Sequence, residues 1–186
     1  MKPLSPNHQK NKVSTAKECA LISVFVSLVI AAQIALSAIP GVEIVTVLFV
    51  VYSFSCGAKR GMLSATAFSI LRQIVFGFFP TVLILYLIYY NLLTLTFGLI
   101  GKKIRYTLKW LPLLVVIACV YTVLFTLIDN VLTPLWYGYG RKAAELYFIA
   151  SLTFVIPQVI CTAVSVSCLF IPLYKIFDIA YKFSKN

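Results

Sequence analysis

Residues 19–39 read CALISVFVSLVIAAQIALSAI, a run that contains no charged side chain. An α-helix needs about 20 apolar residues to cross the hydrocarbon core of a bilayer. Pro40 and Gly41 end the run, because proline lacks a backbone donor and glycine relaxes the turn. We predict that Cys19–Ile39 is the first of several transmembrane helices.

The composition of the whole chain extends this prediction. Of the 186 residues, 61% are hydrophobic and 11% are charged, and the mean hydropathy is +0.98. Soluble domains are typically ~45–50% apolar and ~25% charged. These figures exclude an ordinary soluble enzyme, a disordered chain and a disulfide-rich secreted module. We expect an all-α integral membrane protein that consists almost entirely of spanning segments.

Five further apolar runs follow, separated by glycine, proline and basic residues. We predict spans at Ile44–Cys56, Met62–Phe79, Thr81–Ile100, Leu111–Leu132 and Tyr147–Tyr174. The second of the six spans is short, because about 13 residues reach only ~20 Å as a helix. The chain then divides into a basic tail (1–17), a six-helix domain (18–178) and a second basic tail (179–186). No cleavable signal peptide is expected before the first span.

The basic residues indicate the orientation. Six spans place both termini on one side, and on that assumption thirteen Lys and Arg residues lie on the side of the termini. The opposite side carries only Arg141 and Lys142, and Arg72 lies inside a span. Because Lys and Arg gather on cytoplasmic loops, we predict a protein of the cell membrane with both termini in the cytoplasm. The net charge of +11 then reflects this topology, and no nucleic-acid partner is expected.

Several catalytic and cofactor motifs are missing from the sequence. It contains no Walker A motif, so we do not expect the chain to hydrolyse a nucleotide. Its one histidine, His8, lies in the polar tail and argues against a histidine-built metal site. Its five cysteines form no CxxC pair and are interpreted as small apolar core residues. We therefore expect no enzymatic activity, no cofactor and no bound metal.

Arg72 is the polar residue that most needs an explanation. An ionised side chain in the middle of a membrane helix costs roughly 2.5–3.5 kcal/mol on insertion scales. Arg72 lies ~16 Å along a helix that starts at Gly61, which places it near the bilayer midplane. Two interpretations stay open: Arg72 donates to an anionic or carbonyl-bearing ligand, or it forms an internal ion pair with Glu43 or Asp129.

Other polar residues are expected in the outer half of the spans or near the midplane. For Asn91 and Gln158, an interhelical hydrogen bond is the alternative to contact with a ligand. Together these residues predict a cavity that opens to the outside. Its candidate substrate-binding residues are Glu43, Arg72, Tyr86, Tyr90, Asn91, Asp129, Asn130 and Gln158.

The segment Thr133–Glu145 is polar, aromatic and rich in glycine, so we predict a structured outer loop there. Its aromatic residues form either a lid that stacks on a planar ligand or a belt at the membrane interface. Trp136, Tyr137 and Tyr139 complete the set of candidate substrate-binding residues.

The first span carries a stripe of small residues. The stripe consists of Ala16, Ala20, Ser23, Ser27, Ala31 and Ala38. Because helices associate in lipid through close packing, such a stripe serves either internal packing or the docking of a partner protein. Our candidates for partner docking are Ala16, Ala20, Ser23 and Ser27.

The turn after the second span, with its flanks, reads FSCGAKRGMLSA over residues 54–65. It is similar to the small-Gly-Pro-Lys-x-Gly turn of S components, the substrate-binding membrane subunits of energy-coupling factor (ECF) vitamin transporters. Ala58 stands where proline is frequent in that family. Ala16-x-x-x-Ala20 resembles the AxxxA docking motif of the family, and residues 40–43 occupy the place of its first outer loop. The resemblance covers most of the chain.

This resemblance implies a function. An S component captures a water-soluble vitamin or related micronutrient from outside, under the first loop and near the outer ends of helices four to six. It then docks on a transmembrane coupling protein that carries two ATPase subunits, and it tips within the membrane to release the ligand inward. The missing Walker A motif agrees with this mechanism, because the partners hydrolyse ATP.

Two other functions stay open. An intramembrane enzyme that acts on a lipid or isoprenoid would use Arg72, Asp129 and the tyrosines as its polar groups. A non-catalytic membrane assembly subunit would need no small ligand. If the chain does bind a ligand, Arg72 favours one with a carboxylate, phosphate or ring carbonyl, and the aromatic residues favour a planar ring.

Overall fold

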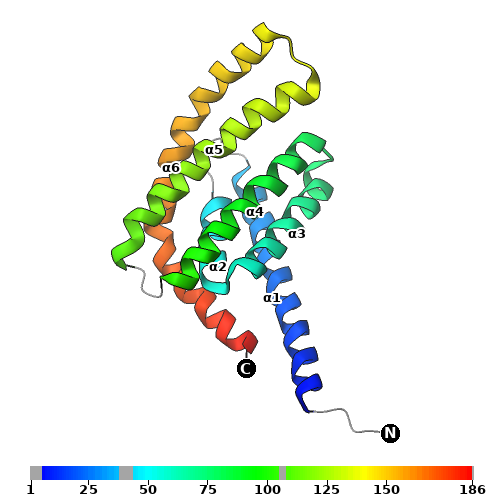
Figure 1. Ribbon diagram of the computed structural model, residues 1–186, viewed down its shortest axis with the longest axis vertical. Helices are drawn as coiled ribbons and strands as arrows, with labels where there is room; N and C mark the ends of the chain where they lie inside the picture. The colour runs from blue at the N-terminus through cyan, green and yellow to red at the C-terminus, as the bar shows by residue number, and fades with distance from the viewer. Residues whose placement is uncertain (1–5, 38–43, 105–107, 186) are drawn as a thin grey trace.

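The computed structural model describes residues 6–37, 44–104 and 108–185 of the chain. These residues form an all-helical bundle without strands, as expected from the sequence (Figure 1). The helices are α1 (Pro6–Leu36), α2 (Val45–Cys56), α3 (Ala58–Phe76), α4 (Pro80–Lys103), α5 (Leu111–Tyr137) and α6 (Arg141–Lys185). A 3₁₀ turn, η1 (Leu108–Trp110), precedes α5.

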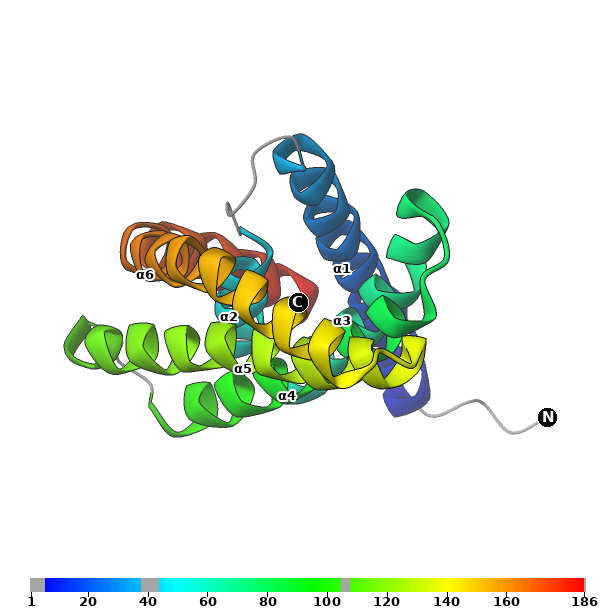
Figure 2. The same cartoon turned by 90° about the horizontal axis from the view of Figure 1, so that it is seen from above.

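Helix α2 forms the centre of the bundle. Residues 45–54 and Cys56 are all buried, and the helix packs against each of the other five. A view along the bundle shows α2 enclosed by its neighbours (Figure 2). A helix of 12 residues is only about 18 Å long. Its apolar surface is therefore covered by the surrounding helices along the whole of its length.

The turn between α2 and α3 depends on two glycines, one in the turn itself and one on the neighbouring helix α4. Gly57 adopts a φ of +90°, a backbone conformation that other residues rarely take. Gly98 of α4 faces the first residue of α3, and a Cβ atom on Gly98 would lie 2.4 Å from the backbone of Ala58. The turn that carries the sequence resemblance is thus also the place where α3 and α4 approach most closely through glycine.

The outer surface of the bundle is apolar, whereas polar side chains lie between the helices. One face of α5 exposes Leu113, Val116, Val120, Val123, Leu127 and Val131. Its opposite face buries Thr122, whose hydroxyl lies 2.9 Å from that of Thr162 on α6. A helix on the surface of a water-soluble protein shows the reverse pattern. This arrangement suits hydrocarbon as the surrounding solvent.

Four helical segments are long and apolar enough to cross a membrane. They are Ala16–Leu36, Pro80–Lys103, Leu111–Tyr137 and Arg141–Tyr181. Helix α2 is apolar but shorter, and α3 is not among the four. Together with the apolar surface, these segments indicate a membrane protein.

The predicted loop at Thr133–Glu145 is wrong. Helix α5 continues to Tyr137, and α6 starts at Arg141, so only residues 138–140 connect them. Pro134 is accommodated inside the last turn of α5, and Gly138 ends the helix in the left-handed conformation with a φ of +64°. The proline and the glycines suggested a longer irregular segment than the chain forms.

Helices α1, α4 and α6 extend beyond the predicted spans, whereas the predicted end of the span Met62–Phe79 is wrong, because α3 runs from Ala58 to Phe76 and residues 77–79 form the turn before α4. Helix α1 starts at Pro6, so much of the predicted N-terminal tail is helical, and α6 runs to Lys185 through the predicted C-terminal tail. The start of α1 and the end of α6 lie at the same end of the bundle (Figure 1).

The two ends of the bundle differ in charge. We call the end that contains Lys59, Arg60, Lys102 and Lys103 the basic end. Helices α2 and α4 both end there, because Gly101 of α4 lies so close to Phe54 of α2 that a Cβ on Gly101 would touch the Phe54 carbonyl. We call the opposite end, with the turns at residues 77–79 and 138–140, the distal end. The grouping of basic residues expected from the sequence therefore matches one physical end of the molecule.

Replacing Gly98 tests the close approach of α3 and α4. Gly98→Ala should lower the thermal unfolding temperature, because its Cβ would meet the backbone of Ala58 and overpacking typically costs about 1–3 kcal/mol. Gly140→Ala is the control, because a Cβ there meets nothing within 4 Å. Thermal unfolding of the detergent-solubilised protein, followed by tryptophan fluorescence, measures both variants. Equal stability of Gly98→Ala and the wild type would contradict the packing described.

Candidate functional site

Arg72 and Tyr86 form the centre of an aromatic cluster near the distal end. Arg72 lies in the last turns of α3 and Tyr86 in the second turn of α4, on either side of the short connection between these helices. The guanidinium carbon of Arg72 lies 4.6 Å from the centroid of the Tyr86 ring and 4.9 Å from that of Phe76. Cation–π contacts of this kind contribute about 0.5–2 kcal/mol.

The guanidinium group of Arg72 keeps unused hydrogen-bonding capacity. Its Nε and Nη1 atoms are buried and have no hydrogen-bond partner among the residues that the structure describes. A buried donor without a partner costs about 1–3 kcal/mol. The two rings beside Arg72 offset part of that cost, but they do not satisfy its N–H groups. Arg72 therefore carries buried N–H groups that no described residue satisfies.

Tyr86 connects α4 with three other helices. Its hydroxyl accepts a hydrogen bond of 3.4 Å from Nε2 of Gln33 on α1. Its ring lies 6.0 Å from that of Phe68 on α3 and 5.9 Å from that of Phe125 on α5, and Tyr90 packs edge-on at 5.2 Å. The Oε1 atom of Gln33 is buried without a partner in the described ranges. The cluster thus places an unused acceptor as well as unused donors beside aromatic rings.

The first turn of α2 packs against the aromatic cluster. Thr46 is fully buried, and its hydroxyl lies 3.5 Å from that of Tyr89 on α4. The Tyr89 ring packs on Phe125 with a centroid distance of 4.9 Å. Phe49 of α2 packs on the rings of Phe68 and Tyr90 with centroid distances of 5.3 and 4.8 Å, so α2 contributes directly to the cluster.

A groove of about 240 Å³ adjoins the cluster between α5 and α6. Phe125 contributes one wall, so the same ring separates the groove from Tyr86. The Oδ1 atom of Asp129 accepts a hydrogen bond of 2.7 Å from Thr133, and Oδ2 accepts one of 2.6 Å from Tyr147. The groove is lined by Phe125, Thr126, Asp129, Tyr147, Ala150, Ser151, Phe154 and Gln158. Asp129 is the one charged residue in that lining.

The predicted substrate-binding residues do not all meet in one hollow. Arg72, Tyr86 and Tyr90 belong to the cluster, whereas Asp129 and Gln158 line the adjoining groove. Phe125 contacts both regions, so they are neighbours.

The two asparagines of the set make interhelical hydrogen bonds. Asn91 accepts a bond of 3.3 Å from Thr66, which holds α3 against α4. Asn130 donates a bond of 2.7 Å to Ser151, which holds α5 against α6. For Asn91 the alternative considered from the sequence therefore describes the contact that is present.

Trp136, Tyr137 and Tyr139 lie at the tip of the α5–α6 hairpin and are 53%, 52% and 42% exposed. The Tyr139 ring contacts that of Tyr147 at 6.1 Å, and Tyr147 lines the groove. Of the three, Tyr139 is thus linked to the groove through one ring. Glu43 lies outside the described residues.

The structure changes the expectations for Arg72. It lies only one turn before Phe76, where α3 ends, so it is nearer the distal end than the predicted midplane. No ion pair joins it to Asp129 in the described part of the chain, because hydroxyl groups hold that carboxylate instead. The proposed pair with Glu43 falls outside the described residues.

Gln33 and Tyr147 belong to this region but were not among the residues predicted from the sequence. Gln33 is the one amide side chain in the apolar run of residues 19–39, which is a usable signal for a polar group inside a span. Tyr147 has no such signal, since its role depends on the register of α6 against α5.

The small residues of α1 face outward. Ala16, Ala20, Ser23 and Ser27 are all exposed, whereas Phe25 on the opposite face is buried. Of the two uses considered for these four residues, internal packing is therefore excluded within the described part of the chain.

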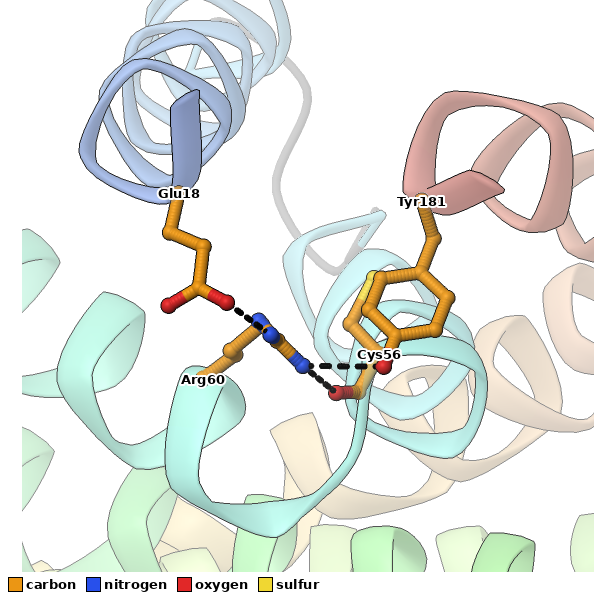
Figure 3. A network of polar contacts seen from close by, with 4 residues as sticks. All are labelled: Glu18, Cys56, Arg60 and Tyr181. Carbon is orange, nitrogen blue, oxygen red and sulfur yellow. Dashed lines mark hydrogen bonds and ion pairs between the residues drawn. The ribbon is translucent and has the colours of Figure 1, made fainter. Parts of the chain in front are cut away.

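A second polar network ties helices together at the basic end (Figure 3). Arg60, in the first turn of α3, donates from Nη2 to the carboxylate of Glu18 on α1. Its Nη1 donates to the carbonyl of Cys56 at 3.2 Å and to the hydroxyl of Tyr181 on α6 at 3.1 Å. The network joins α1, the end of α2, α3 and α6.

Arg60 lies outside the predicted span Met62–Phe79 and stays charged in this network. Burial by itself would lower the pKa of Arg60, but the hydrogen bonds and charges of Glu18 and Tyr181 outweigh it and raise the pKa above its ordinary value. Its guanidinium carbon also lies 4.8 Å from the centroid of the Tyr181 ring. The network is thus a structural clamp on α1 and α6.

No protein-family profile, curated protein or solved structure matches the chain. Among the described residues, no group of three or more His, Cys, Asp or Glu side chains could hold a metal ion. The cluster and groove instead combine unused donors, an acceptor carboxylate and aromatic rings. This combination is suited to binding a small polar ligand.

Replacing Arg60 tests the clamp at the basic end. Arg60→Ala should lower the free energy of unfolding by about 1–3 kcal/mol, because it removes charge-assisted bonds to two other helices. Arg141→Ala is the control, because the exposed Arg141–Glu145 pair on α6 should contribute less than about 1 kcal/mol. Unfolding by SDS, followed by circular dichroism, compares the two. Losses of the same size would show that Arg60 does not clamp the helices.

Proposed function

We propose that this chain is the substrate-capture subunit of an ECF-type importer. It crosses the cell membrane six times with both termini in the cytoplasm, and it binds a water-soluble vitamin or related micronutrient from outside. The observation that carries the proposal is the Arg72–Tyr86 cluster, where buried donors without partners lie beside aromatic rings. The cluster lies near the distal end, opposite the basic residues.

The charge difference between the two ends supports this orientation. Lys59, Arg60, Lys102 and Lys103 lie at the basic end, together with the C-terminal part of α6. Positively charged residues favour the cytoplasmic face of a membrane. The distal end, with the cluster and the groove, then faces the exterior.

The helix arrangement supports six spans. Successive helices run in opposite directions along the bundle, so their connections alternate between its two ends, although α2 covers only part of its length (Figure 1). Helix α2 is too short to cross the hydrocarbon alone, but it is enclosed and needs no contact with lipid. Helix α3 carries Arg72 and Gln73 on its inner side and exposes Leu63, Ile70 and Ile74.

The chemistry of the cluster supports a ligand with an oxygen acceptor. Arg72 donates to a carboxylate, a phosphate or a ring carbonyl of the ligand. The rings of Tyr86 and Phe125 provide apolar faces for a planar ligand ring. Hydrogen bonds to charged groups contribute about 1.5–3 kcal/mol, which corresponds to a factor of roughly 10 to 100 in affinity.

The exposed face of α1 supports docking on a partner. Ala16, Ala20, Ser23 and Ser27 leave a smooth strip on which a second membrane helix can pack closely. A transmembrane coupling protein with two ATPase subunits is the partner that the sequence resemblance implies. Since the chain has no Walker A motif, the energy for transport comes from those partners.

Ligand binding by the purified chain is the first test. One member of a panel of B vitamins and their precursors should raise the unfolding temperature in a saturable way, since a ligand at 100 times its Kd stabilises by ~2.7 kcal/mol. Arg72→Ala should weaken that binding by roughly 10-fold to 100-fold. Arg141→Ala, at the exposed hairpin tip, should bind as the wild type does. Unchanged affinity in Arg72→Ala would remove Arg72 from the site, and turnover of a lipid without partners would favour an enzyme.

Transport is the second test. Growth on trace amounts of the identified compound should require both this chain and a coupling module. Ala20→Leu should impair growth but leave ligand binding intact, because the larger side chain blocks close packing on the exposed face of α1. Ala143→Leu, at an exposed position of α6, is the matched control. Loss of binding and growth together in Ala20→Leu would argue against a separate docking face.

A further inference from the structure

Asp129 has no basic partner among the residues that the structure describes. Within the described part of the chain, the ion pairs join Arg60 to Glu18 and Arg141 to Glu145, and neither involves Asp129. Acidic residues in membrane helices usually pair with a base or mark a functional site, because their insertion is costly. The charge of Asp129 therefore needs a partner of another kind.

Both oxygens of the Asp129 side chain take part in hydrogen bonds. Both oxygens accept from hydroxyl groups, one from Thr133 at 2.7 Å and the other from Tyr147 at 2.6 Å. Each oxygen of a carboxylate can accept a further bond, because it has two lone pairs. The side chain is thus held in a fixed position with acceptor capacity left over.

The groove around Asp129 is shaped for a small organic ligand. Phe125 and Phe154 are aromatic walls, and Gln158 and Ser151 add polar groups. Its volume of about 240 Å³ is below the roughly 300–1,000 Å³ of sites for drug-sized ligands. A ligand with a single ring therefore fits best.

We propose that the α5–α6 groove binds a protonated amine carried on an aromatic ring, with the ammonium group at Asp129 and the ring at Phe125 and Phe154. A cationic group compensates the one charge in the lining, and the aromatic faces attract it as well. The proposal rests on the proposed function and names the class of its substrate: a micronutrient with a cationic nitrogen near a ring.

Two matched pairs of compounds test this proposal: pyridoxamine with pyridoxine, and benzylamine with benzyl alcohol. In each pair an amine is replaced by a hydroxyl group, so the comparison isolates the charge. Affinities are measured by microscale thermophoresis on the protein in nanodiscs. At neutral pH, the amine of at least one pair should bind at least about 10-fold more tightly than its hydroxyl partner.

Two variants separate the charge of Asp129 from the structure around it. Asp129→Asn keeps the size and one acceptor but removes the charge, and it should abolish the preference for the amine. Tyr147→Phe removes a hydrogen bond to Asp129 but keeps the charge, and it should retain the preference. The unfolding temperatures of the free proteins check that both variants are folded.

Each result decides the proposal. No amine preference in either pair, or a preference that persists in Asp129→Asn, would overturn it. If Asp129→Asn fails to fold, an amine preference in wild type and Tyr147→Phe supports the proposal, and its absence overturns it. Failure here is distinct from failure of the proposed function, which is judged by vitamin binding through Arg72 and by growth that depends on the coupling module.

Discussion

The structure depends on the burial of α2, a 12-residue apolar helix that contacts every other helix of the bundle. Without lipid contact, its packing surface must be provided by the chain itself. The α2–α3 turn fixes the C-terminal end of α2 at the basic end of the bundle, where Gly98 permits the backbone of α4 to approach Ala58. At the other end α2 stops short, since about 18 Å of helix cannot match a hydrocarbon core of ~30 Å. Phe49 of α2 packs there on the rings of Phe68 and Tyr90, which in turn contact Tyr86.

Much of the fold could be predicted from the sequence because apolar runs are long and their ends are marked. The prediction of Ile44–Cys56 differs from α2 by one residue, and α5 starts at Leu111 as predicted. The hairpin between α5 and α6 was mispredicted, since Pro134 and the following glycines normally interrupt a helix. Proline near the end of a helix removes few hydrogen bonds, so packing of α5 on α6 keeps this segment helical.

The residues of the site were easier to predict than the contacts between them. A charged or amide side chain in an apolar run is conspicuous, and Arg72, Asp129 and Gln158 were selected for that reason. Which side chains meet depends on the rotation and register of each helix, and a single sequence does not contain that information. Thus Arg72 packs on Tyr86 instead of pairing with Asp129, and the carboxylate is held by Tyr147, which has no distinguishing signal.

The separation of the two charges argues for a ligand role more strongly than either charge alone. If Arg72 and Asp129 served only to stabilise the bundle, direct pairing would offset the cost of placing both in the membrane. Instead the rings of Tyr86 and Phe125 lie between the guanidinium and the groove that contains Asp129. Each charge is held by weaker neutral partners, namely rings on one side and hydroxyl groups on the other. Each charge keeps hydrogen-bonding capacity that neutral partners leave unused: N–H donors on Arg72 and acceptor lone pairs on Asp129. Under the proposed function, this arrangement gives up some stability of the protein for affinity, which is the balance expected of a site that captures a scarce compound.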